Sequence, residues 1–205
     1  MLNSNGFDLW ADGYDKAVGL SDEENSYPFA GYKEILNKIY QAISSKGKSS
    51  VLDIGFGTGT LAQKLYEQGH EIWGQDFSRK MIEIASAKMP NAHLYQGDFS
   101  QGLAEPILGN SYDFIVATYS LHHLTDARKV TFIRSLVTLL KEGGLILIGD
   151  VAFENRMALD RCKEEAGDEW DQDEIYFVFE ELREGIPELK FQQVSYCAGL
   201  LWIKR

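Results

Sequence analysis

Three glycines at alternate positions mark the stretch of this sequence best suited to binding a ligand. Residues 50–54 form a short apolar run that predicts a buried parallel strand, and Gly55, Gly57 and Gly59 follow it directly. A helical pattern of apolar residues then begins at Leu61. A strand, a glycine turn and a helix bring bare backbone N–H groups up to a ligand, and glycine allows both the close approach and positive φ angles.

The spacing of the glycines distinguishes between two kinds of cofactor site. A dinucleotide fingerprint reads G-x-G-x-x-G, and its third glycine would fall at Thr60. The sequence instead reads G-x-G-x-G, with Asp53 two residues before the first glycine. This spacing disfavours a nicotinamide-dependent oxidoreductase, which stays as one alternative. A glycine-rich turn that binds nothing is another.

Acidic and aromatic residues follow the next two predicted strands. The strand predicted at 71–75 leads into Asp76 and Phe77, about 20 residues past the glycines, the spacing at which a carboxylate meets ribose hydroxyls. The strand after it is followed by Asp98 and Phe99, which suit the amine and ring of adenine. Ligands of open α/β sheets bind beyond the carboxyl ends of the strands, where these residues fall. Asp76 could instead cap a helix, and Asp98 could serve a turn.

A fourth predicted strand, at 112–118, leads into hydroxyl and imidazole groups. The residues concerned are Ala117, Thr118, Tyr119, His122 and His123. Because the two histidines are adjacent, we expect at most one of them to face a given side. A neutral histidine here could act as a general base, although a packed core or surface histidine is the simpler interpretation.

Strands alternate with helices along most of the chain. The predicted strands are 50–54, 71–75, 92–96, 112–118 and 145–148, with two more at 191–198 and 200–204 that meet at Gly199. Such alternation predicts a doubly wound, mostly parallel sheet with right-handed crossovers. The short final connection can only join antiparallel strands, so the sheet should end in a hairpin. Two amphipathic helices are predicted before the sheet, the second starting near Pro28.

Five segments in order and in register resemble the motifs of class I S-adenosylmethionine (SAM)-dependent methyltransferases. They are residues 53–59, 75–78, 96–99, 112–117 and 140–144. The segment Ser120-Leu-His-His-Leu-Thr-Asp126 is similar to one in small, poorly characterised bacterial members. The resemblance implies a seven-stranded Rossmann-like methyltransferase fold, SAM as cofactor and methyl transfer as the reaction. It also implies that Tyr14, within the segment from Trp10 to Asp15, meets the methionine carboxylate.

Together, the residues and the resemblance predict one site. The cofactor residues are Tyr14, Asp53, Gly55, Phe56, Gly57, Thr58, Gly59, Asp76, Phe77, Asp98, Phe99, Ala117, Thr118 and Tyr119. His122 or His123 is nominated as the catalytic base. Asp53 either contacts the cofactor or braces the glycine loop. We expect one domain over residues 1–205, with a helical lid at 1–45, a SAM-binding core at 48–150, and acceptor-side helices and a closing hairpin at 151–205.

The composition of the chain limits the kinds of partner that we expect it to bind. A formal net charge of −11 with no basic patch disfavours nucleic acid. No apolar run approaches the ~18 residues of a membrane span. Cys162 and Cys197 are far apart, without CxxC or histidine pairing, so we expect neither a metal site nor a disulfide and place the protein in the cytoplasm.

The sequence leaves the acceptor and the assembly open. A small-molecule methyl acceptor is expected, and the protein is expected to be a monomer or a homodimer. A SAM-binding regulatory protein without catalysis stays as an alternative, as does aminopropyl transfer on a related fold.

Overall fold

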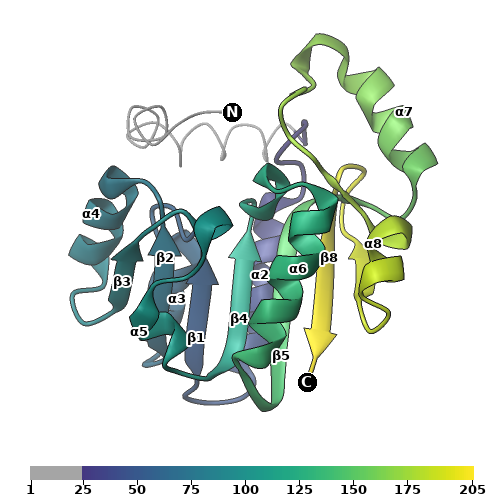
Figure 1. The fold of residues 1–205 in the computed structure, drawn as a ribbon. Helices are drawn as coiled ribbons and strands as arrows, with labels where there is room; N and C mark the ends of the chain where they lie inside the picture. The colour runs from purple at the N-terminus through teal and green to yellow at the C-terminus, as the bar shows by residue number, and fades with distance from the viewer. Residues whose placement is uncertain (1–24) are drawn as a thin grey trace.

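The computed structural model describes residues 25–205, so Tyr14 and the first predicted helix lie outside the described residues. Within this range eight strands form one sheet in the order β3-β2-β1-β4-β5-β8-β7, with the short β6 paired to the end of β5 (Figure 1). Their bounds are β1 Ser50–Ile54, β2 Glu71–Asp76, β3 His93–Gln96, β4 Tyr112–Thr118, β5 Leu140–Phe153, β6 Phe177–Val178, β7 Lys190–Gln193 and β8 Ala198–Lys204. The strands from β3 to β5 are parallel, and β8 runs antiparallel to both β5 and β7. The predicted parallel sheet with a closing hairpin is confirmed.

Helices cover both faces of this sheet. They are α2 Tyr32–Ser44, α3 Thr60–Glu67, α4 Arg79–Lys88, α5 Glu105–Leu108, α6 Asp126–Thr138, α7 Arg156–Ala166 and α8 Phe179–Gly185, with 3₁₀ turns η1 Phe99–Gln101, η2 Leu121–His123 and η3 Gly167–Glu169. Successive strand residues point to opposite faces, so Val51 packs with the helices α2, α3, α4 and α7, and Leu52 with α5, α6 and α8. In Figure 1, α7 stands beyond the carboxyl ends of the parallel strands. No helix between residues 25 and 205 has the length and apolarity that crossing a bilayer requires.

The helix α2 belongs to the core rather than to a lid. Its apolar stripe, which includes Ile35 and Ile39, is buried. A Cβ built on Gly149 of β5 would lie 2.2 Å from Cγ2 of Ile35, so the helix packs directly on the sheet. The lid expected for residues 1–45 is therefore wrong for Tyr32–Ser44, because this stripe covers a sheet face and not the strand ends. The helix also begins four residues after the expected start near Pro28.

The closing hairpin turns earlier than predicted. Gly199 was expected to join the two strands, but it lies inside β8, paired with Asp150 and Gln193. The turn is formed at Val194 to Cys197 instead, where the Val194 N–H donates to the carbonyl of Ala198. A Cβ on Gly199 would lie 2.3 Å from the ring of Phe191, so this glycine makes room for an aromatic ring rather than for a turn.

Candidate functional site

A cavity of ≈ 210 Å³ opens at the carboxyl ends of the parallel strands. It is lined by Gly55, Gly57, Asp76, Phe77, Met81, Asp98, Phe99, Ser100, Thr118, Tyr119, Ser120, His123, Leu124 and Arg128. A narrower cavity of ≈ 20 Å³ adjoins the same loop and is lined by Asp53, Phe56 and Thr58 among others. A larger hollow of ≈ 560 Å³ lies at the opposite, amino end of the sheet beside Lys46 and Lys48. The site is assigned to the carboxyl edge, because open parallel sheets bind ligands there.

The loop after β1 keeps its backbone bare through its three glycines. Gly55, Gly57 and Gly59 have φ angles of 69°, 55° and 79°, the left-handed region in which a side chain is strained. A Cβ on Gly55 would lie 2.5 Å from Cβ of Ser120. The Ser120 hydroxyl donates to the carbonyl of Ile54 over 2.8 Å and so ties the end of β1 to the loop after β4.

Asp76 holds this loop in place. Its Oδ2 accepts from the N–H of Gly57 over 2.8 Å, and its Oδ1 accepts from the N–H of Ser78 over 2.9 Å. Ser78 is itself the N-cap of α4 and accepts from the N–H of Met81. The capping alternative for Asp76 is therefore wrong, because Ser78 caps α4 and Asp76 holds the backbone on either side of the turn before it. Since a carboxylate offers about four acceptor positions, Asp76 can still accept from ligand hydroxyls in the cavity.

Asp53 is buried beneath the loop without bracing it. Its side chain is 2 % exposed, and its Oδ1 has no hydrogen-bond partner among residues 25–205. Burial, together with the nearby charge of Asp76, raises the pKa of the Asp53 carboxyl to about 8. Of the two alternatives for Asp53, bracing the loop is instead done by Asp76. A buried carboxyl at this place is suited to a cationic group that enters the narrow cavity.

Asp98 and its neighbours form the far wall of the cavity. Asp98 Oδ1 accepts from the N–H of Ser100 over 2.8 Å and caps η1, as the turn alternative predicts. Its neighbour Phe99 stacks on Phe132 with the ring centroids 5.6 Å apart, so this ring is packed between the cavity and α6. Asp98, Phe77 and Phe99 all line the cavity, so a carboxylate and two phenylalanine rings adjoin the space available to a base.

Among the predicted site residues that the structure describes, Gly59, Ala117 and His122 line neither cavity. The missing side chain of Gly59 makes room for Ala85 of α4 and for Met89, the residue that caps the end of α4. Ala117 points into the opposite core, because it alternates with Thr118 along β4. Tyr119 follows with a φ of 50° and lines the cavity, with its ring beside those of Phe29 and Tyr32.

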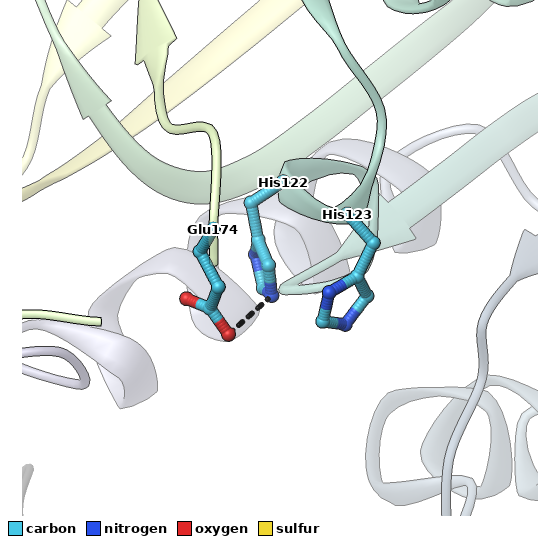
Figure 2. Close-up of side chains that lie close together, drawn as sticks. All are labelled: His122, His123 and Glu174. Carbon is cyan, nitrogen blue, oxygen red and sulfur yellow. Dashed lines mark ion pairs between the residues drawn. The ribbon is translucent and has the colours of Figure 1, made fainter. Parts of the chain in front are cut away.

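The two histidines lie close together, and of the pair only His123 lines the cavity. Both belong to η2, and their ring centroids are 4.3 Å apart. In a 3₁₀ turn, neighbours are only about 120° apart, which lets two large rings converge. His122 is buried, with Nδ1 2.6 Å from Oδ1 of Asp150 and Nε2 3.4 Å from Oε1 of Glu174 (Figure 2). His123 faces the cavity.

The pKa values of the two histidines are shifted in opposite directions. Burial alone would lower the pKa of His122, but Asp150 and Glu174 outweigh it and raise the pKa to about 10. Burial and the positive charge of His122 lower the pKa of His123 to about 4. Burial would raise the pKa of Glu174, yet its contacts with His122 lower it to about 2. Near neutral pH, in the absence of any bound cation, His122 is therefore an imidazolium and His123 is neutral.

Several residues of the site were not predicted. Met81, Ser100, Ser120, Leu124 and Arg128 line the cavity, and Asp150 and Glu174 hold His122. Asp150 comes just after the strand predicted at 145–148, so the positional rule that found Asp76 could have found it too. Glu174 lies in an irregular segment of an acidic stretch, and its sequence carries no signal that singles it out.

Comparisons with known proteins agree with this geometry. Residues 51–144 match the family described as "Methyltransferase domain". An uncharacterized methyltransferase of Geobacillus sp. (strain WCH70) is 42% identical over 161 residues, which cover 78% of this chain and 72% of that protein. Among solved structures, magnesium protoporphyrin IX methyltransferase from Synechocystis PCC 6803 with bound S-adenosylhomocysteine (SAH) superposes with a TM-score of 0.67 at 18% identity, over 86% of this chain and 84% of that one. The DhpI–SAH complex superposes with a TM-score of 0.68 at 18% identity, over 99% of this chain and 94% of that one.

Proposed function

Because this chain belongs to the class I SAM-dependent methyltransferase family, we propose that it transfers the methyl group of SAM to a small organic acceptor. The observation that carries the proposal is the convergence of three strand ends on one cavity. The glycine loop after β1, Asp76 at the end of β2 and Asp98 after β3 all line it. These are the groups that a nucleoside with a charged side chain requires: bare N–H donors, hydroxyl acceptors and an acceptor for an exocyclic amine.

The buried acids suit the cofactor's charges. SAM carries a sulfonium and an ammonium group, and a desolvated cation needs a nearby anion. Asp53 offers a buried Oδ1 that has no partner among residues 25–205, beside the loop that Asp76 holds. An ammonium group in the narrow cavity would ionise Asp53 and satisfy that oxygen. This fit supports SAM over a ligand of net negative charge.

The chain's part in the reaction is mainly positioning. When bound, SAM supplies an electrophilic methyl group and leaves as a neutral thioether, so its departure needs no acid. The loop and the strand-end residues would orient the methyl group toward the acceptor and keep water out. Such orientation can lower a barrier by ~7–11 kcal/mol in favourable cases. The Tyr119 ring and His123, which line the cavity past β4, are proposed to form the acceptor's side of it.

The two histidines nominated as a base are not equivalent. Both ring nitrogens of His122 face carboxylates, and its pKa of about 10 leaves it without a basic nitrogen near neutral pH. His123 lines the cavity and is neutral, so one of its ring nitrogens has a lone pair that can accept a proton, but its pKa of about 4 makes it a weak base. The acceptor-activating role is therefore proposed for His123, with His122 as a positioning residue. We expect His123→Ala to lower turnover with little change in SAM affinity.

Calorimetry with SAM tests the proposal. Asp76→Asn keeps the shape of the side chain but removes its charge and one of the two oxygens that accept from Gly57 and Ser78, and a hydrogen bond to a charged group contributes about 1.5–3 kcal/mol. We therefore expect the Kd for SAM to rise by about 10- to 100-fold. Asp113→Asn is the matched control, because Asp113 pairs with Lys141 at the amino end of the sheet and should leave the Kd unchanged.

The outcomes are distinct. No SAM binding by the folded wild-type protein would overturn the proposal, and equal Kd values for wild type and Asp76→Asn would remove Asp76 from the site. A screen of small acceptors with methyl-labelled SAM then tests transfer, since binding without transfer to any acceptor would favour a regulatory role.

A further inference from the structure

Three side chains with metal-ligating atoms meet at one side of the cavity. His122 and His123 come from η2, and Glu174 comes from the irregular segment between η3 and β6 (Figure 2). One ligand atom of each lies within 4.8 Å of the ligand atoms of the other two. The binding of SAM does not require such a group, and Glu174 lies outside every motif found in the sequence.

The spacing suits a single ion. Two ligand atoms that are about 2.1 Å from one ion at a tetrahedral angle are roughly 3.4 Å apart. The Nε2 of His122 and Oε1 of Glu174 are 3.4 Å apart, longer than an ordinary charged hydrogen bond. The ligand atom of His123 lies within 4.8 Å of the ligand atoms of the other two residues. We propose that His122, His123 and Glu174 bind one divalent transition-metal ion, of which Zn²⁺ is the type.

The atoms behind this group orient it toward a shared centre. Asp150 Oδ1 lies 2.6 Å from Nδ1 of His122, which directs Nε2 of the ring inward. The Tyr176 hydroxyl donates to Oε2 of Glu174 over 2.6 Å, which directs Oε1 inward. A carboxylate behind a ligating histidine is the usual partner at zinc sites and fixes the orientation of the ring.

The segment that carries Glu174 is fastened to the histidine turn. The N–H of Ile175 donates to the carbonyl of His122 over 2.9 Å. The ammonium group of Lys129, fully buried on α6, donates to the carbonyl of Ile175 and to Oδ1 of Asp126. Glu174 is therefore held beside the histidines by the backbone on one side of it, and the three ligands do not need a mobile loop to meet.

The formal charges favour a divalent cation over a lone proton. Asp150 is fully buried and Glu174 is mostly buried, so His122 lies between two carboxylates. An imidazolium offsets one of these negative charges, whereas a divalent ion on neutral imidazoles offsets both. Burying unbalanced charge is costly, and Oδ2 of Asp150 already has no hydrogen-bond partner among residues 25–205. Two imidazole nitrogens and one carboxylate suit Zn²⁺ and its first-row neighbours rather than Mg²⁺ or Ca²⁺.

Such an ion would also determine which chemical groups of an acceptor can be activated at the site. Three protein ligands leave a coordination position for water or substrate, and His123 places the site at the wall of the cavity. An acceptor hydroxyl or thiol bound there would have its pKa lowered by the ion, so in the metal-bound protein the ion would activate the acceptor and His123 would act as its ligand and not as a base. This consequence for the acceptor rests on the proposed methyl transfer, whereas the metal site itself does not.

Metal binding by the untagged protein, first stripped with a chelator, tests the site. We expect one Zn²⁺ per chain by calorimetry, and d–d absorption bands of nitrogen and oxygen ligation when Co²⁺ is used instead. His123→Ala and Glu174→Gln should each weaken binding by ~10-fold or more, and Asp150→Asn by ~10- to 100-fold. The control is His93→Ala, because His93 and Glu71 form an exposed pair 3.9 Å apart that should not contribute.

The wild-type titration decides the question even if a variant fails to fold. A folded wild-type protein that takes up no Zn²⁺ or Co²⁺ overturns the proposal and leaves His122 as an ion-paired imidazolium. Binding that survives in Glu174→Gln and His123→Ala, or that disappears in His93→Ala, overturns it as well. SAM affinity measured on the same samples separates the two proposals: binding of SAM without metal refutes only this one, and binding of metal without SAM refutes only the proposed function.

Discussion

Replacing Asp53 with asparagine should change how the stability of this protein depends on pH. The carboxyl has an unfolded pKa near 3.8 and a folded pKa of about 8, because it is buried and lies near Asp76. Between these values the folded state keeps a proton that the unfolded state has lost. The free energy of unfolding therefore falls by about 1.4 kcal/mol for each pH unit in this window and levels off above the folded pKa.

The size of the effect follows from these two values. Linkage over a single site gives a loss of about 2 kcal/mol between pH 6 and pH 8. The amide introduced by Asp53→Asn has no proton to lose, so this variant should gain about 2 kcal/mol relative to wild type across the interval. The isosteric amide also removes the cost of ionising a buried carboxyl.

Urea denaturation of both proteins at pH 6, 7 and 8 measures the difference. Contributions from other titrating groups cancel in the comparison, provided that their pKa values are the same in both proteins. Asp113→Asn is a suitable control, since burial raises the Asp113 pKa but Lys141 and Ser50 lower it overall, and this carboxyl is ionised throughout the interval. A stability difference between wild type and Asp53→Asn that stays constant from pH 6 to pH 8 would refute the reasoning.

The remaining predictions concern the loop and the Glu174 segment. Binding of SAM near pH 7 should release a proton from Asp53. The release would make the calorimetric binding enthalpy differ between buffers of different ionisation enthalpy. If Asp53→Asn shows the same difference between buffers, the ammonium group of SAM does not reach this carboxyl. Gly55→Ala should abolish SAM binding and destabilise the fold by more than the ~1–2 kcal/mol of Gly57→Ala, because only the former meets another side chain; equal losses would contradict this. Lys129→Met should destabilise the protein by about 1–3 kcal/mol and speed amide exchange at Ile175, and unchanged exchange there would show that the ammonium does not hold the segment.

The local sequence pattern was enough to predict the strands, the glycine loop and two of the acids that form the site. The strand from Ser50 to Ile54 is buried along its whole length, and an apolar run followed by glycines at alternate positions has few other ways to fold. Asp76 and Asp98 were found because parallel strands end at one edge, so a position in the sequence becomes a position in space. The same rule would have reached Asp150, just past the strand predicted at 145–148.

Local pattern misled where one residue type serves two purposes. Gly199 was interpreted as a turn residue. It is instead a strand residue that lacks a side chain, and the ring of Phe191 across the hairpin occupies the space left free. The stripe on Tyr32–Ser44 was correctly predicted as amphipathic, yet amphipathicity does not specify which surface the helix covers. In both cases the partner lies outside the local pattern, and only packing identifies it.

The sequence by itself determined the alternation of strands and helices, the bare glycine loop and the acids at its edge, because each of these depends on neighbours a few residues away. Only the tertiary structure decided which acid braces the loop and which lies beneath it without a partner among the described residues. It also made His122 an ion-paired residue and left His123 at the cavity, through Asp150 and Glu174, which are 28 and 52 positions from His122. Charge and burial depend on distance in space, and the chain sets those distances only when the sheet has brought its strand ends together.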